Sequence, residues 1–401
     1  MAAAMAMRLW CFVVHPGVVY DYPGSEYGTL AAHWAQSGTL SYDGKSPSAI
    51  RLPLYPLLLA AVYTVTDHAP SPWPARPVHL LLAALVAALT YHAARRLVGP
   101  DWALGAALLA GMNPELAQLD WGMAVESLFT PEFIFVSLTA LRALEAPERT
   151  GRWLACGAAV GVSLLTRSTL LFWPPILGAL LAWHRPVPGA LRRAALLCAA
   201  AYLCLTPWLA RNWAQFHRVI PFEDGMGWHM LWQGSTSVEG IAPDEYLPEP
   251  LRTYFFTKDP RIGPASKELA LRNIRAYPLR YAGYCLRRIP VLWFRGAWAE
   301  RGLGYDDAFH AYLARGQWHK AAAKALFKLI ELSVIGAALV GMAAAWPQAA
   351  GRILALQLLY MNIHIFTMGL PRYMAPVFPL TALFAVKGAS WLWQRRRPAV
   401  A

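Results

Sequence analysis

Two carboxylates and a guanidinium group frame the first long polar stretch of the chain, residues 20–56. Asp21 and Glu26 stand near its beginning, and Arg51 stands near its end, directly before a Leu-Pro-Leu-Tyr-Pro run. A carboxylate can deprotonate a hydroxyl group, whereas a guanidinium group binds phosphate through paired hydrogen bonds. These residue types predict a group transfer in which Asp21 or Glu26 is catalytic and activates an acceptor hydroxyl. For either acid alone, a role as a turn or cap residue is the simpler interpretation.

Two further acids, Asp120 and Glu126, stand at the outer end of a later apolar segment and are candidate secondary acids. An acid at membrane depth is costly, so it is a functional candidate by default. Solvation at the membrane surface is the competing interpretation for Glu126. Glu132 lies deeper in the same segment, and a structural partner is its alternative role.

Cations at the outer ends of predicted helices are the candidate binding groups for a donor phosphate. They are Arg51, Arg211 and Arg372, together with Lys328 from a lysine stripe at helical spacing. Such side chains also reach lipid headgroups, which is the better interpretation for any one of them alone. Several arginines that converge on one anion would favour a phosphate site.

The composition places these groups in a membrane protein. Of the 401 residues, 57% are hydrophobic and only 15% are charged, which is typical of polytopic membrane proteins. The net charge of +13 comes from basic residues beside apolar segments, where they act as topology signals and phosphate contacts. We therefore expect membrane lipids as partners and no nucleic acid.

Cysteine and histidine spacing gives no sign of a metal centre. The five cysteines are scattered without a CxxC pair, so neither a disulfide framework nor a zinc site is expected. A divalent metal bound through the acids is compatible with the sequence, but no pattern requires one. The cofactor therefore stays open.

Apolar stretches predict an all-α protein with about ten transmembrane helices, because a spanning helix needs roughly 20 apolar residues. The predicted spans are 1–19, 78–98, 102–119, 123–144, 153–166, 170–183, 190–208, 322–346, 353–368 and 374–393. The first is interpreted as a span rather than as a removed signal peptide. The predicted parts are an N-terminal transmembrane module (1–210) with an amphipathic first outer loop (20–76), a long outer loop (211–321) and C-terminal transmembrane helices (322–401).

Basic residues predict the orientation and one helix at the membrane surface. Arginines fall on alternate short loops, which predicts that this side, with the N- and C-termini, is cytoplasmic. We therefore expect a multi-pass protein of the cytoplasmic (inner) membrane with its active site on the outer face. In the long loop, residues 262–295 show apolar groups at helical spacing with arginines opposite, which predicts an interfacial basic helix broken at Pro278 and Pro290.

Six motifs, spread from the first loop to the last span, carry a resemblance to a known family. In chain order they are YPGSEYGTLAAHWAQSG, RLPLYPLLLA, VESLF, LLTRST, PWLARNW and PRYMAPVFPL. Together they resemble glycosyltransferase family 39, the bacterial relatives of the dolichyl-phosphate-mannose protein mannosyltransferases, which include aminoarabinose transferases. The resemblance implies the glycosyltransferase C fold and an inverting transferase that uses a polyprenyl-phosphate sugar.

The resemblance also assigns positions in the site. It matches the family's second acid to Glu126, its arginine before the Pro-x-Tyr-Pro run to Arg51, and the motif that opens the last span to Arg372. The catalytic aspartate that the family carries in the first loop falls on Gly24. Asp21 or Glu26 would then have to replace it.

The favoured hypothesis is a hexosyl- or pentosyltransferase. It would transfer a sugar from a polyprenyl-phosphate donor to a lipid, glycan or protein acceptor on the non-cytoplasmic face. A transporter or lipid flippase is less favoured, because the acids gather on one face rather than at the midplane. A non-catalytic partner of a transferase is the third hypothesis, because Gly24 stands at the expected aspartate. The sequence specifies neither the sugar nor the acceptor.

Overall fold

The protein is described by a computed structural model over residues 2–14, 26–66, 72–240, 247–294 and 307–396. Within these ranges every regular element is a helix, apart from one isolated β-bridge between Ser41 and Pro47. The predicted all-α class is confirmed. Asp21 lies outside the described residues.

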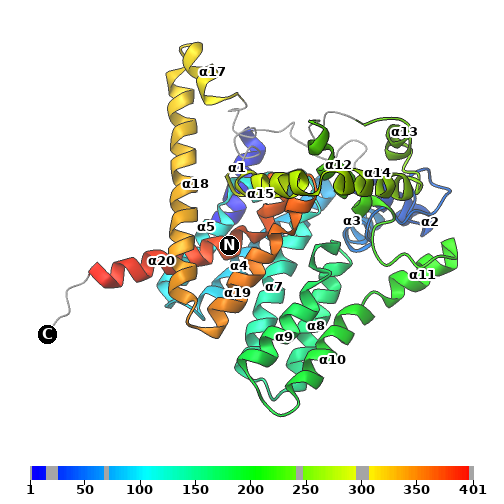
Figure 1. The fold of residues 1–401 in the computed structure, drawn as a ribbon. Coiled ribbons are helices and arrows are strands. Elements are labelled where there is room, and N and C mark those ends of the chain that lie inside the picture. Colours follow the sequence, from blue (N-terminus) through cyan, green and yellow to red (C-terminus); the bar gives the residue numbers. More distant parts are fainter. Residues whose placement is uncertain (1, 15–25, 67–71, 241–246, 295–306, 397–401) are drawn as a thin grey trace.

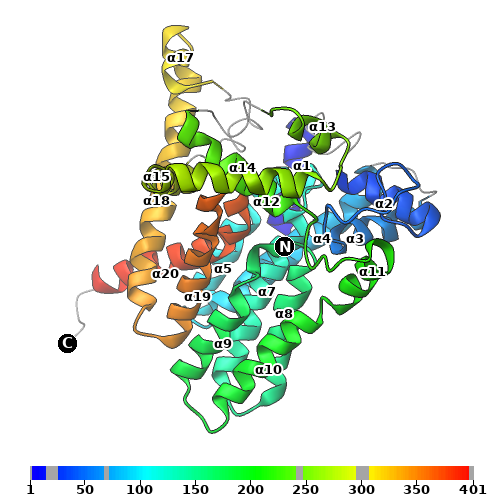
Figure 2. The ribbon, with the colours of Figure 1, turned by 45° about the vertical axis from the view of Figure 1, so that its right-hand side comes forward.

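The helices form a bundle that is covered at one end by an outer layer, the helices of residues 226–235 and 251–294 (Figures 1 and 2). In chain order the α-helices are α1 Ala2–Val14, α2 Glu26–Ser37, α3 Leu54–Thr64, α4 Pro72–Ala94, α5 Pro100–Gly111, α6 Pro114–Trp121, α7 Glu126–Glu145, α8 Thr150–Leu164, α9 Trp173–His184, α10 Ala190–Leu203, α11 Thr206–Phe216, α12 Met226–Ser235, α13 Leu251–Phe256, α14 Ile262–Ala276, α15 Pro278–Phe294, α17 Phe309–Ala314, α18 Trp318–Ala345, α19 Ala349–Tyr360 and α20 Phe378–Arg396. Four 3₁₀ helices complete the set: η1 Ser168–Leu170, η2 Thr236–Glu239, η3 Met361–Phe366 and η4 Pro371–Val377.

Five helical stretches of the described residues are long and apolar enough to cross a membrane. They are Trp73–Ala94, Glu126–Glu145, Trp318–Ala345, Ala349–Phe366 and Pro371–Arg396. The bent pair α10 and α11 makes a sixth if it is counted as one span. The predicted number of ten is therefore not confirmed. Helices α8 and α9 are only 15 and 12 residues long, and the predicted span 102–119 is interrupted between α5 and α6.

That interruption has a local cause. Helix α5 ends at Gly111, and Asn113 caps α6, because its side-chain oxygen accepts a hydrogen bond from the backbone N–H of Leu116 at 2.8 Å. Pro114 follows at the first position of α6. Asparagine as a cap followed by proline is a helix start signal, so a new helix begins here.

Helix α7 lies at the centre of the bundle. Phe129, Phe133 and Ile134 are completely buried, and α7 packs against α4, α8 and α9. A helix with neighbours on several sides belongs to the core of the bundle rather than to its rim. Its first residue, Glu126, lies at the end of the bundle that the outer layer covers.

Helices α18 and α20 cross at glycines. A methyl group added at Gly341 would lie 1.8 Å from the carbonyl oxygen of Phe384, and one added at Gly388 would lie 2.1 Å from that of Ala337. Only glycine allows two helix backbones to approach this closely. The crossing fixes α20 and therefore η4, which directly precedes it.

The first polar stretch folds into α2 and α3, which pack together. The amphipathic segment predicted for this loop corresponds to α2, which buries Leu30 and Ala31. Helix α3 was not predicted, although its sequence is apolar. With 11 residues it is too short to cross a membrane, so it packs on α2 through Tyr55 and Leu59.

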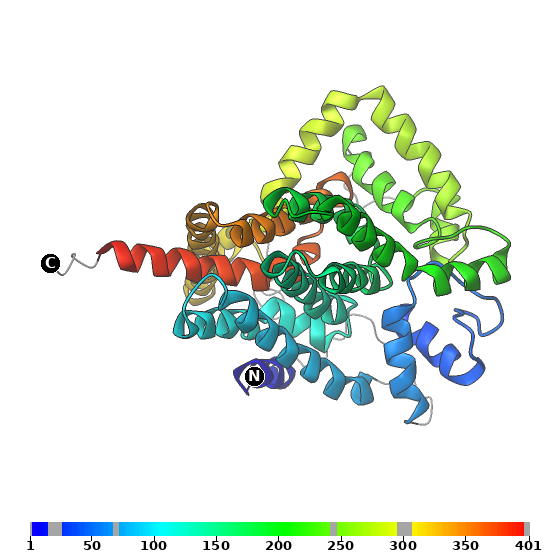
Figure 3. The ribbon, with the colours of Figure 1, turned by 90° about the horizontal axis from the view of Figure 1, so that it is seen from below.

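The predicted interfacial segment 262–295 is found as α14 and α15, which form a V that projects beyond the bundle (Figure 3). The V bends at Pro278, as predicted, because α14 ends at Ala276 and α15 begins at the proline. The expected break at Pro290 is wrong, since this proline lies inside α15. Leu279 and Leu286 are exposed on α15, as suits a helix lying on a membrane surface.

Candidate active site

Glu26 lies between two cations. Its Oε2 accepts a hydrogen bond from Nε of Arg51 at 2.6 Å, and its Oε1 accepts one from Nζ of Lys258. Glu26 begins α2, Arg51 lies in the loop before α3, and Lys258 lies in the turn between α13 and α14. The three side chains are 22%, 20% and 19% exposed, so solvent reaches this cluster.

A second carboxylate, Glu126, is nearly inaccessible at 1% exposure. Its Oε1 accepts a hydrogen bond from Nη1 of Arg167 at 2.6 Å, and Nε of Arg372 lies 3.8 Å from the same oxygen. The ring of Tyr373 lies 5.0 Å from the guanidinium carbon of Arg167 and 5.6 Å from that of Arg372. This arrangement brings the start of α7, the turn before η1 and η4 together.

One backbone hydrogen bond joins the segments that carry the two acid–cation groups. The N–H of Leu54 donates to the carbonyl of Leu165 at 3.1 Å. Leu54 stands three residues after Arg51, and Leu165 stands two residues before Arg167. The loop that positions the first arginine is thus fixed against the turn that positions the second.

Tyr27 lies near both acid–cation groups, the one around Glu26 and the one around Glu126. Its ring meets the ring of Tyr55 edge to face at 5.2 Å. Burial raises the pKa of Tyr27 to about 12, against the effect of nearby cations. The charged groups that act on this phenol come from both acid–cation groups: Arg51, Arg167, Glu126 and Glu26. We treat these residues, with Lys258 and Arg372, as one candidate site.

Lys258 was not among the site residues predicted from the sequence. It adopts a positive φ of 57° and lies 4.6 Å from the ring centre of Phe255. That ring stacks on His229 of α12 at 5.2 Å. Burial, with the charges of Arg51 and Lys258, lowers the pKa of His229 to about 4, so this imidazole is neutral at physiological pH. No local pattern marks Lys258, because it stands in a polar turn whose partner is 232 residues away.

The ion pairs set the charge state of Glu26. Burial alone would raise its pKa, but the charges of Arg51 and Lys258 outweigh burial and hold the pKa below its usual value. Burial also opposes the charge on Arg51, yet the Glu26 carboxylate raises the pKa of this arginine. Both groups are therefore ionised at neutral pH. A carboxylate with a lowered pKa is a weak base while it stays paired.

Two of the predicted phosphate ligands have other contacts. Nη1 of Arg211 donates to the carbonyl of Ser48 at 3.0 Å and to Oδ1 of Asn212 at 2.8 Å. Nζ of Lys328 donates to the carbonyl of Phe294 at 2.8 Å and to Glu331 at 2.7 Å. These contacts fix the first loop and α15, whereas the other two predicted ligands, Arg51 and Arg372, face the acids of the candidate site.

Asp120, a predicted secondary acid, pairs with Arg8 of α1. Arg8 Nε donates to Asp120 Oδ2 at 2.9 Å, and the two side chains are only 2% and 8% exposed. Arg8 also donates to the carbonyls of Ala4 and Gly111. The pair joins α1 to α6. An arginine inside an apolar stretch requires such a partner, which was the available signal for this contact.

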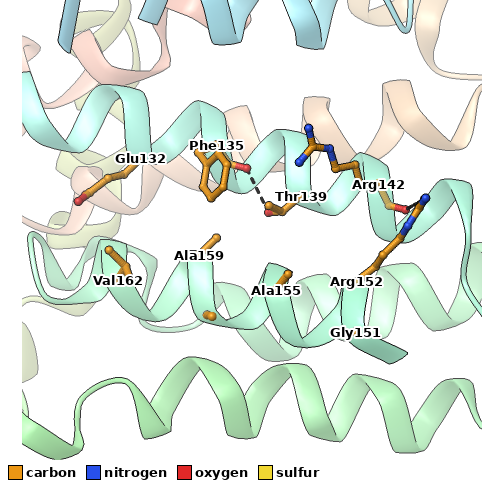
Figure 4. A pocket seen from close by; sticks show the side chains of 10 residues that line it. Glu132, Phe135, Thr139, Arg142, Gly151, Arg152, Ala155, Ala159 and Val162 are labelled. Atoms are coloured by element: carbon orange, nitrogen blue, oxygen red, sulfur yellow. Dashed lines mark hydrogen bonds between the residues drawn. The ribbon is translucent and has the colours of Figure 1, made fainter. Parts of the chain in front are cut away.

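A separate cavity of about 500 Å³ lies between α7 and α8 (Figure 4). Glu132 stands at one end, where its Oε1 accepts a hydrogen bond from the Thr166 hydroxyl at 2.9 Å. Arg142 and Arg152 stand at the other end. Glu132 thus has the structural partner that was its alternative role. Neither Glu26 nor Glu126 lines this cavity.

No group of three or more histidine, cysteine, aspartate or glutamate side chains that could hold a metal ion occurs in the described part of the chain. Glu26 and Glu126 face cations instead.

Comparison with known proteins bears on this arrangement. Residues 46–211 match the family model of dolichyl-phosphate-mannose-protein mannosyltransferase. That range contains Arg51, Glu126 and Arg167. It confirms the predicted resemblance to this family. A search of curated proteins found no match.

The structure of ArnT from Cupriavidus metallidurans bound to undecaprenyl phosphate superposes on the chain with a TM-score of 0.55. The chain has the glycosyltransferase C fold. Sequence identity is 16%, and the match covers 98% of this chain but 61% of ArnT, so the chain spans about three-fifths of its length. The apo structure of ArnT matches with a TM-score of 0.41 at 16% identity, over 96% of this chain and 76% of ArnT. In this example of the glycosyltransferase C fold, the candidate site lies where the first loop, the start of α7 and η4 meet.

Proposed function

We propose that this protein is a membrane glycosyltransferase that transfers a hexose or a pentose from a polyprenyl-phosphate donor to a lipid, glycan or protein hydroxyl. The single observation that carries the proposal is the meeting of Glu26 and Glu126 with an excess of cations in one site. The family match over residues 46–211 supports the reaction class. ArnT, which shares the fold, binds undecaprenyl phosphate, and this supports the choice of donor.

The balance of charge in the site suits an anionic donor. Four cations face two carboxylates, which leaves two positive charges: the cations are Arg51, Lys258, Arg167 and Arg372, and the acids are Glu26 and Glu126. A sugar phosphodiester carries one negative charge, and the departing phosphate monoester carries up to two at neutral pH. The site is therefore better matched to the leaving group than to the donor, which favours the transition state.

The proposed transfer needs one base and one anion site. Glu26 accepts the proton of the acceptor hydroxyl as its oxygen attacks the anomeric carbon. The bond between that carbon and the phosphate oxygen breaks, and polyprenyl phosphate leaves with the electron pair. Asp21 is the other candidate for the base. Glu126 fixes Arg167 and Arg372 toward the site through its contacts.

The proposed location is the cytoplasmic membrane, with the site on the outer face. Clusters of arginine stand at the opposite end of α7, around the turn that contains Arg149 and Arg152. Positive residues in short loops favour the cytoplasmic side. The first loop and η4 then open to the other side, where a lipid-linked donor would meet its acceptor.

Transfer from a labelled donor tests the proposal. The purified protein in liposomes is given a panel of undecaprenyl-phosphate hexoses and pentoses, and release of undecaprenyl phosphate is measured. We expect release with one donor class and a strong reduction in the Arg51→Met variant. Arg149→Met is the matched control, because Arg149 is 68% exposed at the opposite end of α7.

Absence of release with every donor, from protein that is folded, would contradict the proposal. Restoration by a second membrane subunit would then identify a non-catalytic partner of a transferase. Movement of the donor lipid across the bilayer without sugar transfer would identify a flippase.

A further inference from the structure

The Glu26 carboxylate occupies a position that suits a phosphate. Each of its oxygens accepts a hydrogen bond from a different cation, Arg51 on one side and Lys258 on the other. A phosphate group offers the same pair of oxygens to a guanidinium and an ammonium group. A carboxylate that bridges two cations is thus an internal substitute for an anionic ligand.

The cations around Glu26 have uncharged neighbours on their other sides. Arg51 lies 5.9 Å from the ring centre of Tyr27, and Lys258 lies 5.9 Å from that of Tyr42. Within the described parts of the chain, Glu26 is the acid found in an ion pair with either cation. If Glu26 moved away, both cations would lose this counter-ion and would face each other across the vacated position. An anion from outside could then take the place of the carboxylate.

The three residues come from separate parts of the chain, so the contact can open without unfolding an element. Glu26 stands at the first turn of α2, whereas Lys258 stands in a turn of the outer layer. All three side chains are partly exposed, at 19–22%. Partly exposed ion pairs contribute little net stability, so they exchange partners readily. The buried Glu126 at 1% exposure lacks this access.

We infer that the position between Arg51 and Lys258, which the Glu26 carboxylate occupies, is the binding site for the donor's phosphate. The phosphate displaces the Glu26 carboxylate when the donor binds. This inference rests on the proposed function. On replacement both cations bind the phosphate, and the Glu26 carboxylate becomes free to accept the acceptor's proton. The base is therefore strengthened only when a donor is present, because two positive charges no longer hold its proton affinity low.

Binding of undecaprenyl phosphate tests this exchange. The purified full chain is titrated with undecaprenyl phosphate in detergent, and the dissociation constant is measured for wild type, Glu26→Gln and Lys258→Met. Glutamine has the shape of glutamate but no charge, so it competes weakly for the cations. We expect Glu26→Gln to bind about tenfold more tightly than wild type and Lys258→Met to bind less tightly than wild type.

A matched control separates competition from a general charge effect. Glu148 is 63% exposed at the far end of the bundle, and Glu148→Gln changes the net charge by the same amount. We expect this control to bind like wild type. Thermal unfolding adds a second readout, since undecaprenyl phosphate should raise the melting temperature more in Glu26→Gln than in wild type.

The outcomes distinguish the exchange from the proposed function. Equal or weaker binding by Glu26→Gln, in a preparation whose wild type binds the lipid and transfers sugar, overturns the exchange alone. Absence of binding and transfer in both wild type and Glu26→Gln overturns the exchange together with the proposed function. An equal gain in affinity in Glu148→Gln also overturns the exchange, because the effect would then be one of net charge.

Discussion

Glu26 and Glu126 are both carboxylates paired with cations, yet their surroundings differ in accessibility. Glu26 is 22% exposed and is held by side chains from two loops. Glu126 is 1% exposed and is held by Arg167, which directly precedes η1, and by Arg372 of η4. An accessible pair can exchange partners with a ligand, whereas a buried pair is costly to break. We therefore expect Glu26 to act in the chemistry and Glu126 to hold the site in shape.

The largest expected effect is on turnover, and it concerns Glu26. Replacing Glu26 with glutamine removes the proposed base, so the rate of sugar transfer should fall by about 100- to 10,000-fold. The free energy of unfolding should change by less than about 1 kcal/mol, because the pair is partly exposed. Unchanged turnover would exclude Glu26 as the base. If turnover also survives in the Asp21→Ala/Glu26→Ala variant, neither first-loop acid is catalytic.

Replacing Glu126 should affect the stability of the fold strongly, whereas replacing Glu26 should affect mainly turnover. The Glu126→Gln variant leaves Arg167, which is 15% exposed, without its carboxylate partner, and this should lower the free energy of unfolding by about 2–3 kcal/mol. Thermal unfolding in detergent measures this loss. The Glu126→Gln/Arg167→Met variant is the control, since removing both charges should recover part of the stability. A melting temperature equal to that of wild type would contradict the view of Glu126 as a fixed structural pair.

Acid should remove the contribution of the Glu26 pairs. The pKa of Glu26 is lowered from its ordinary value of 4.5 in the folded protein. The pairs therefore stabilise the fold above pH 4.5, and this contribution is lost as the pH falls through the lowered pKa. The difference in melting temperature between wild type and Glu26→Gln should shrink as the pH is lowered from neutral to below 4.5. A difference that grows in acid would reverse the sign expected from the ion pairs.

The smallest effect is expected at Lys328. This predicted phosphate ligand donates to the carbonyl of Phe294 and to Glu331, so Lys328→Met should change transfer by less than about twofold, whereas Arg51→Met should abolish most of it. Initial rates at saturating and limiting donor concentrations measure both. A strong rise in KM for Lys328→Met alone would restore Lys328 as a phosphate ligand.

Much of the fold follows from local patterns. The apolar segments predicted the helices of the bundle, and the amphipathic character of the first outer loop agrees with α2. The number of spans did not follow, because hydropathy does not distinguish one crossing from two short helices divided at Asn113 and Pro114. The V of α14 and α15 shows the same limit, since Pro278 bends it and Pro290 is tolerated.

The site was predictable where charge and position along a helix coincide. Arg51 and Arg372 were predicted as phosphate ligands at outer helix ends, and the structure places each beside an acid of the candidate site. Lys258 could not be found in this way, because its partner is set by how the outer layer packs on the first loop. The pairing of Asp120 with Arg8 also depends on how distant segments pack together. Only the presence of a cation in an apolar segment indicated that pairing.

The crossing of α18 and α20 has a consequence for reading inactive variants. Gly388 lies against the carbonyl of Ala337, and even alanine there would push the two helices apart. Helix α20 is continuous with η4, so such a wedge would shift Arg372 although it touches no ligand. A genetic screen for loss of transfer should therefore recover Gly388 and Gly341 alongside the charged residues. Loss of transfer in those glycine variants would reflect displacement of Arg372 rather than a second catalytic site.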